Sequence, residues 1–119
     1  MTREELLHRL DEISNLGDNW NLEGAKPINR GVIINARKII TDFENPPHFI
    51  SPVSYGTIQL EWENNNGYYI EIELEQPIEN RYKITIFILN NIDDTQMFKS
   101  IEFEDYMLID NLVELFINS

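Results

Sequence analysis

The 119-residue sequence contains no cysteine, few basic residues, two histidines and no long apolar run. Without cysteine, the chain can form no disulfide, no thiolate zinc site and no cysteine nucleophile. No window approaches the roughly 18 apolar residues of a membrane-spanning helix. Nine Lys and Arg against 21 Asp and Glu give a formal net charge of −12. This imbalance disfavours nucleic acid and anionic membranes as direct partners, because both are bound through clusters of Lys and Arg.

The first ten residues, MTREELLHRL, carry charges on both sides of a short apolar pair. They lack the continuous apolar core of a signal peptide. We therefore expect a cytoplasmic protein. The length suits a single domain over residues 1–119, whose core needs no disulfide to be stable.

Helical spacing of apolar residues predicts two N-terminal helices and one C-terminal helix. The first helix, over residues 3–15, begins after Thr2, which forms a capping-box pattern with Glu5. The second, over residues 30–43, follows Asn29 as its N-cap. The third begins near Asp105. Each helix carries an apolar stripe, so each is expected to pack on a core.

The middle of the chain alternates apolar and polar residues, which predicts antiparallel strands over residues 57–63, 68–75 and 81–89. Residues 49–53 and 97–103 can add two further strands. One face of this sheet is apolar, and we expect the helices to cover it. The predicted fold class is α+β: two N-terminal helices, an antiparallel meander of three to five strands, and a C-terminal helix.

The strand registers follow from keeping the apolar residues on one face, because a one-residue slip would bury glutamates. The Asn64–Gly67 loop favours a three-residue turn and sets Glu61 opposite Glu71. In the next hairpin, pairing of opposite charges favours Leu74 opposite Tyr82, Glu73 opposite Lys83 and Glu75 opposite Arg81.

The polar face of the predicted sheet is the feature most informative for function. Its glutamates outnumber its basic residues, and two of them oppose each other as like charges. Aromatic residues on the same face offer apolar anchors for a partner. The candidate partner-binding residues are Glu61, Glu63, Tyr69, Glu71, Glu73 and Phe87. Two alternatives are a solvated face that prevents aggregation and a face covered by another element.

Two segments resemble motifs of a group of small bacterial and phage proteins. Trp20–Pro27 follows the pattern W-x-x-x-G-A-x-P, and Gly56–Trp62 follows G-x-I-x-L-E-W. The resemblance covers about residues 6–75 and implies a loop between the first and second helices. It also implies a mobile-element, antitoxin-like or phage counter-defence setting, with no particular chemistry. We expect Trp20 to pack on the helices or the sheet, and we retain Trp20, Glu23 and Lys26 as loop candidates for ligand contact.

The sequence contains no recognisable catalytic motif. His8 and His48 are the only histidines, and neither lies beside a nucleophile and an orienting acid. No nucleophile elbow, Walker loop, dinucleotide fingerprint or HExxH motif occurs. Asp93 and Asp94 are hard oxygen ligands, but their context is typical of a polar turn. We expect no catalytic residue, no dedicated metal site and no cofactor.

Three hypotheses about function follow from these observations. The first is a non-enzymatic inhibitor of a basic, often nucleic-acid-binding protein, of the antitoxin, immunity or phage counter-defence type; DNA mimicry is a variant of it. The second is a small-ligand-binding or enzymatic domain that uses the Asp18–Pro27 loop with His48. The third is a self-associating structural protein, joined by an exposed edge strand and the C-terminal helix. Both a monomer and a homodimer are compatible with the sequence.

Overall fold

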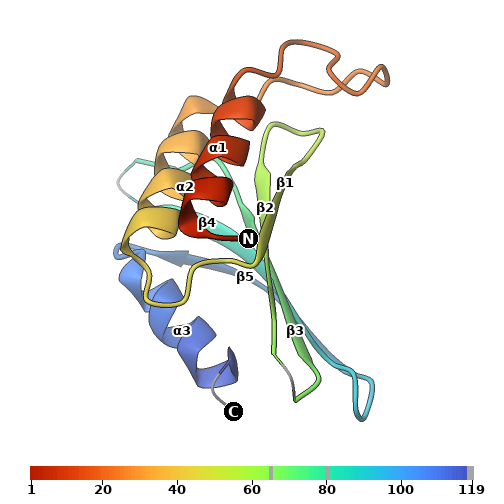
Figure 1. Ribbon diagram of the computed structural model, residues 1–119, viewed down its shortest axis with the longest axis vertical. Helices are drawn as coiled ribbons and strands as arrows, with labels where there is room; N and C mark the ends of the chain where they lie inside the picture. Colours follow the sequence, from red (N-terminus) through yellow and green to blue (C-terminus); the bar gives the residue numbers. More distant parts are fainter. Residues whose placement is uncertain (65, 80, 118–119) are drawn as a thin grey trace.

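The computed structural model describes residues 1–64, 66–79 and 81–117. These residues form three helices and a five-stranded antiparallel sheet, which confirms the predicted α+β class (Figure 1). In chain order, the elements are α1 (Arg3–Ser14), α2 (Arg30–Asp42), β1 (Phe49–Pro52), β2 (Ile58–Glu63), β3 (Tyr68–Leu74), β4 (Tyr82–Asn90), β5 (Thr95–Phe103) and α3 (Met107–Ile117).

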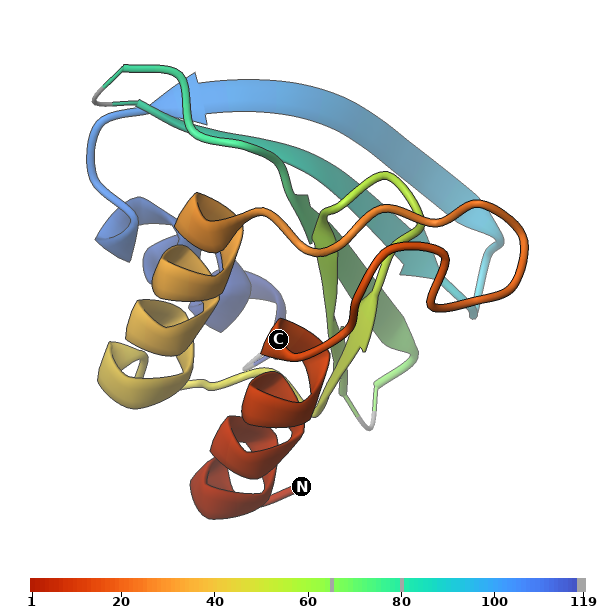
Figure 2. The same cartoon turned by 90° about the horizontal axis from the view of Figure 1, so that it is seen from above.

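The sheet is a meander in which the spatial order β1-β2-β3-β4-β5 follows the sequence. All three helices lie on one side of it, as Figure 2 shows from above. We call this side the inner face and the opposite side the outer face. Among the described residues, no helix is long and apolar enough to cross a membrane.

The core lies between the helices and the inner face. β2, β3 and β4 each bury every second residue, as the period-two pattern predicts. Trp62 on β2 is fully buried, and its indole N–H donates to the backbone oxygen of Asn45 at 2.9 Å. The helices contribute the other side of this core through Leu6, Leu10, Ile13, Val32, Ala36, Ile39, Ile40, Ile109 and Val113.

The predicted helix starts are confirmed. Thr2 Oγ1 accepts from the Glu5 N–H at 3.1 Å, and Glu5 Oε1 accepts from the Thr2 N–H at 3.0 Å, completing the capping box. Asn29 Oδ1 accepts from the N–H groups of Gly31 and Val32 at the start of α2. These side chains satisfy N–H groups that have no partner within the helix.

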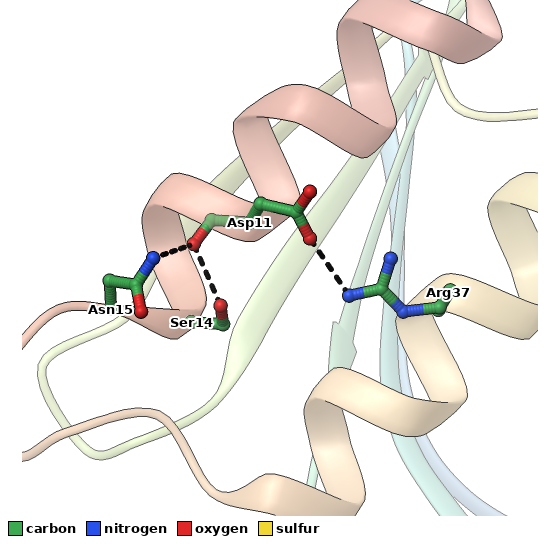
Figure 3. A network of polar contacts seen from close by, with 4 residues as sticks. All are labelled: Asp11, Ser14, Asn15 and Arg37. Carbon is green, nitrogen blue, oxygen red and sulfur yellow. Dashed lines mark hydrogen bonds and ion pairs between the residues drawn. The ribbon is translucent and has the colours of Figure 1, made fainter.

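α1 and α2 pack side by side, and an exposed ion pair joins them. Arg37 of α2 lies 3.0 Å from Asp11 of α1 (Figure 3). At the end of α1, the Ser14 hydroxyl and the Asn15 side-chain amide both donate to the Asp11 backbone oxygen, at 2.7 and 3.0 Å. Because both charged side chains of the ion pair are exposed, packing contributes more than this pair to the helix contact.

The register of the β2–β3 hairpin is as predicted, whereas that of β3–β4 is shifted by two residues. Glu61 lies opposite Glu71; Asn65, in the turn expected between these strands, lies outside the described residues. In the next hairpin, Leu74 pairs with Ile84 rather than Tyr82, and Glu73 pairs with Thr85 rather than Lys83. A shift of two keeps every side chain on its predicted face.

A bulge before the β3–β4 turn explains the shift. Ile78 and Arg81 exchange two backbone hydrogen bonds of 3.2 and 2.9 Å. The next pair is formed by Glu75, whose N–H donates to the Lys83 oxygen at 3.0 Å. Gln76 and Pro77 therefore face the single residue Tyr82, which is a β-bulge.

The charge pairs of this hairpin change accordingly. Neither predicted pair, Glu73 with Lys83 or Glu75 with Arg81, is formed. Lys83 Nζ instead lies 4.0 Å from Glu75. Arg81 reaches β5 and the residue after it, with its nitrogens 3.9 Å from carboxylate oxygens of Glu102 and Glu104.

Candidate partner-binding surface

The six partner-binding candidates all lie on the outer face of β2, β3 and β4. In each strand they alternate with buried residues of the inner face. The three helices lie on the other side of the sheet (Figure 2). Within the described chain, therefore, no helix covers this face. The sequence had left open that another element of the chain covers it.

The opposed carboxylates of Glu61 and Glu71 are bridged by a tyrosine. The hydroxyl of Tyr69 lies 2.9 Å from Glu61 Oε1 and 3.3 Å from Glu71 Oε1. Glu61 Oε1 also accepts from the Gln59 side-chain amide at 2.8 Å. Partial burial, together with the hydrogen bond to Glu61 and the neighbouring charge of Glu71, raises the pKa of the Tyr69 hydroxyl well above its usual value. The hydroxyl therefore stays protonated at neutral pH and donates to a carboxylate.

The remaining glutamates of this face meet hydroxyl groups or solvent. Glu73 accepts from the Thr57 hydroxyl at 3.0 Å, and Glu75 from the Thr85 hydroxyl at 3.2 Å. Glu63 is exposed. Across the described residues, Glu75 near Lys83 is the only one of these glutamates in an ion pair, so Glu61, Glu63, Glu71 and Glu73 give this face an excess of negative charge.

A row of outward-facing side chains crosses all five strands, with aromatic residues at both of its ends. The registers align Phe49, Glu61, Glu71, Phe87 and Phe98 as consecutive cross-strand neighbours on the outer face. Phe98 is 73% exposed and Phe49 is 41% exposed. The Arg9 guanidinium lies over the Phe49 ring, 4.8 Å from its centroid, which leaves Phe98 as the barer end.

Phe49 and Phe98 were not among the sequence candidates. They lie in the two less regular predicted strands, where the apolar residues Ile50 and Met97 stand directly beside them, so the sequence did not indicate which of the two side chains faces outward. The acidic centre is thus flanked by apolar rings, an arrangement found at protein interfaces, where anchors lie beside polar contacts.

The loop before α2 is built from its own asparagine side chains. Asn19 Oδ1 accepts from Gly24 N–H at 2.7 Å, and Asn21 Oδ1 accepts from the N–H groups of Glu23 and Ala25 at 2.9 and 3.0 Å. These bonds compensate for a backbone in the left-handed region at Asn19 (φ 60°), Leu22 (φ 63°) and Gly24 (φ 86°). The side chains of Asn19 and Asn21 are therefore used within the loop.

The three loop candidates differ in their surroundings. Trp20 is half-buried, and its indole N–H donates to the Lys26 backbone oxygen at 2.7 Å, so it closes the loop on itself. The side chains of Glu23 and Lys26 are exposed, and neither forms an ion pair among the described residues. These two candidates therefore offer solvent one carboxylate and one ammonium group.

The two motif segments lie close together, and hydrogen bonds of their flanking residues hold them there. The Lys26 backbone N–H donates to the backbone oxygen of Ser54, just before the second motif, and the backbone N–H of Asn29, just after the first motif, donates to the backbone oxygen of Gly56, both at 2.9 Å. Gly56 has φ +90°, and a Cβ there would lie 3.0 Å from the Pro27 oxygen. Glycine at the start of the second motif is therefore required by the close approach of the first.

His48 lies far from this loop. Its ring Nδ1 accepts from the backbone N–H of Glu63 at 3.0 Å, and its backbone N–H donates to the backbone oxygen of Glu61 at 2.8 Å. These contacts place it at the end of β2 remote from Gly56, about 20 Å away along the strand. The loop and His48 therefore do not form one site, which removes the geometric basis of the hypothesis that combined them.

In the described part of the chain, no group of three or more His, Asp or Glu residues is placed to hold a metal ion. Comparison with protein families, with curated proteins and with solved structures found no match for this chain. The resemblance of the two motifs to small bacterial and phage proteins therefore stays a prediction.

Proposed function

We propose that this protein is a small acidic interaction protein that binds and inhibits a basic partner protein through the outer face of its sheet. The observation that carries the proposal is the combination of carboxylates that have no ion-pair partner with exposed aromatic rings, on a face that no helix of the described chain covers. The proposed class is the antitoxin, immunity or phage counter-defence type, which is also the setting that the motif resemblance implies.

The charges of this face suit attraction at long range. Glu61, Glu63 and Glu71 are not paired with a cation among the described residues, and the whole chain carries −12. Such a field accelerates encounters with a positive surface by roughly tenfold or more at low ionic strength. Carboxylates that are already held in place by Tyr69 lose less side-chain entropy when they bind.

The aromatic rings supply short-range affinity. Phe87 and Phe98 are neighbours on β4 and β5, and Phe98 has most of its surface in solvent. Burying such a ring against an apolar pocket of the partner contributes about 1–3 kcal/mol. The partner is thus expected to have a basic rim around an apolar depression, and many nucleic-acid-binding proteins have a suitably basic surface.

A tagged form of the protein tests the proposal in a nuclease-treated lysate, with bound protein eluted by increasing salt. The test variant is the triple substitution Glu61→Gln, Glu63→Gln and Glu71→Gln, which retains hydrogen-bond acceptors. The matched control removes the same charge away from this face, by Glu4→Gln, Glu44→Gln and Glu114→Gln, all exposed positions.

We expect a basic protein that is captured by the unmodified chain and by the control, and that elutes with salt. With that partner purified, the test variant should associate about 5–10 times more slowly, with a flatter dependence on ionic strength. Equal association rates for the test variant and the unmodified chain would refute the assignment of this face.

Competition with duplex DNA separates DNA mimicry from other inhibition. A mimic and DNA exclude each other from the partner, because the carboxylates occupy phosphate positions. Simultaneous binding of the protein and DNA to the partner would reject mimicry while leaving the acidic interface intact.

A further inference from the structure

The two edges of the sheet differ in how they are protected. β1 is four residues long and contains Pro52, and the Arg9 side chain donates to the backbone oxygen of Ile50 at 2.6 Å. A short edge with a proline and a side-chain cover is a common defence against pairing with another chain. β5 has nine residues, no proline and no glycine, and every residue from Asn91 to Ser100 is exposed.

The backbone of β5 presents a row of open hydrogen-bonding groups. The backbone oxygen of Lys83 accepts from Glu75, the residue after β3, so the backbone groups of Lys83 point toward β3, and this direction alternates along β4. Ile84, Ile86 and Ile88 therefore face β5, where they pair with Ile101, Lys99 and Met97. The alternate residues of β5 point their backbone N–H and C=O groups away from β4, toward the free edge. These residues are Gln96, Phe98, Ser100 and Glu102.

We propose that β5 is a self-association edge, through which two copies of this chain pair antiparallel about a two-fold axis at Phe98 to form one continuous ten-stranded sheet. The occupant of the edge is a second copy because the strand itself carries no net charge and so does not repel a copy of itself. Within Thr95–Phe103, Lys99 and Glu102 are the only charged residues, so this segment is neutral in a chain of −12.

Side-chain pairing favours an axis at Phe98 over the two axes further along the strand. An axis at Lys99 would place two ammonium groups opposite each other, and an axis at Ser100 would place Phe98 opposite Glu102. With the axis at Phe98, the exposed Phe98 rings of the two copies pair with each other, and Lys99 lies opposite Met97 of the second copy. The outward backbone groups of Gln96 and Ser100 also face each other across the pair, as an antiparallel ladder requires.

On the inner face of the proposed dimer, an apolar groove of one copy lies near an exposed apolar side chain of the other copy. A groove of about 220 Å³ lies between α3 and the sheet, lined by Ile84, Ile101, Leu108, Ile109 and Leu112. Met97 is 44% exposed and Leu108 is 54% exposed. In the proposed register, Met97 lies diagonal to Ile101 of the second copy, so each Met97 is placed at the rim of the other copy's groove.

The absence of cysteine allows a direct test by cross-linking. In the proposed pair, the two Cα atoms at position 98 are about 5.5 Å apart, within the range that a disulfide spans. A Phe98→Cys variant should therefore form a covalent dimer under mild oxidation. Gln96→Cys alone and Ser100→Cys alone are the matched controls, because each is about 13 Å from its own copy along the strand. A mixture of these two controls should cross-link.

Sedimentation of the chain without substitutions completes the test. We expect a monomer–dimer equilibrium that shifts toward dimer at high salt, because salt screens the repulsion between two acidic chains. Ser100→Pro removes one outward N–H without touching the β4 ladder and should weaken dimerisation at least tenfold, whereas Ser100→Thr keeps that N–H and should not. A chain that stays monomeric at millimolar concentration in high salt, or a dimer that Phe98→Cys fails to trap, would overturn the proposal.

Discussion

Replacing Tyr69 by phenylalanine tests whether one hydroxyl allows two glutamates to face each other on the sheet. The substitution keeps the ring and removes the group that lies 2.9 Å from Glu61 and 3.3 Å from Glu71. We expect the variant to fold in the same way and to be less stable, since the carboxylates then repel each other without a shared donor.

The expected loss can be estimated from these contacts. A hydrogen bond to a charged group contributes about 1.5–3 kcal/mol when it is buried. Tyr69 and Glu61 are only half-buried, so solvent screens the interaction, and Gln59 still donates to Glu61 at 2.8 Å in the variant. We therefore expect a loss of about 1–1.5 kcal/mol, or a decrease in Tm of roughly 4–6 °C for a domain of this size.

Urea denaturation at neutral pH measures the loss, and a double-mutant cycle assigns its cause. In a Glu61→Gln background, Tyr69→Phe should cost less, because the hydroxyl no longer serves an ionised acceptor. The coupling between the two substitutions should be at least about 0.5 kcal/mol. A single-variant loss within 0.3 kcal/mol of zero, or purely additive effects, would refute the bridging role of the hydroxyl.

Two further predictions concern residues away from the outer face. Asp110 of α3 is buried, and its carboxylate accepts from the backbone N–H groups of Glu44 and Asn45 at 3.2 and 3.4 Å. Asp110→Ala should therefore lower the free energy of unfolding, measured by urea denaturation, by about 2 kcal/mol, and Asp110→Asn should lower it less. The hydrogen bond to Asp42 and partial burial raise the pKa of Tyr106 to about 12 from 10.0. Between pH 10 and 12 the unfolded state binds fewer protons than the folded state, so stability falls as pH rises through this window. Tyr106→Phe should make that decline in Tm shallower, and an unchanged slope would contradict it.

The secondary structure could be predicted from the sequence because each element has one buried face. In β2, Ile58, Leu60 and Trp62 are buried at every second position, which is the pattern that the sequence displays. The two less regular segments, 49–53 and 97–103, also became strands, β1 and β5, because they pair with neighbours whose own pattern is strong. Helix starts were readable because Thr2 and Asn29 act through local hydrogen bonds.

The β3–β4 register could not be predicted, because hydrophobic alternation cannot distinguish registers that differ by two residues. The choice then depended on cross-strand charge pairs worth about 0.2–1 kcal/mol each. The bulge at Gln76 and Pro77 decided the register instead, together with the hydrogen bonds between Ile78 and Arg81. Proline lacks an N–H for the ladder, and this was the local clue to an interruption.

The acidic face was predictable from the alternation of apolar and polar residues alone, whereas the contacts among its side chains were not. Glu61 and Glu71 were expected to face each other, and they do. That the Tyr69 hydroxyl lies between them depends on the rotamers of three side chains, which no sequence pattern specifies. The aromatic row likewise needs the correct β3–β4 register, since only that register aligns Phe87 with Glu71.

The two proposed surfaces have opposite dependences on salt, which makes them separable in one preparation. Binding of a basic partner to the outer face should weaken as salt rises, whereas pairing through the neutral β5 edge should strengthen. A two-fold axis perpendicular to the sheet places both outer faces of the proposed dimer on the same side. Two acidic surfaces would then face one partner, or two sites of one assembly, and the second contact would form at an effective concentration set by the dimer. A partner with repeated basic sites should therefore dissociate faster from Ser100→Pro than from Ser100→Thr, although neither substitution changes a charge on the outer face.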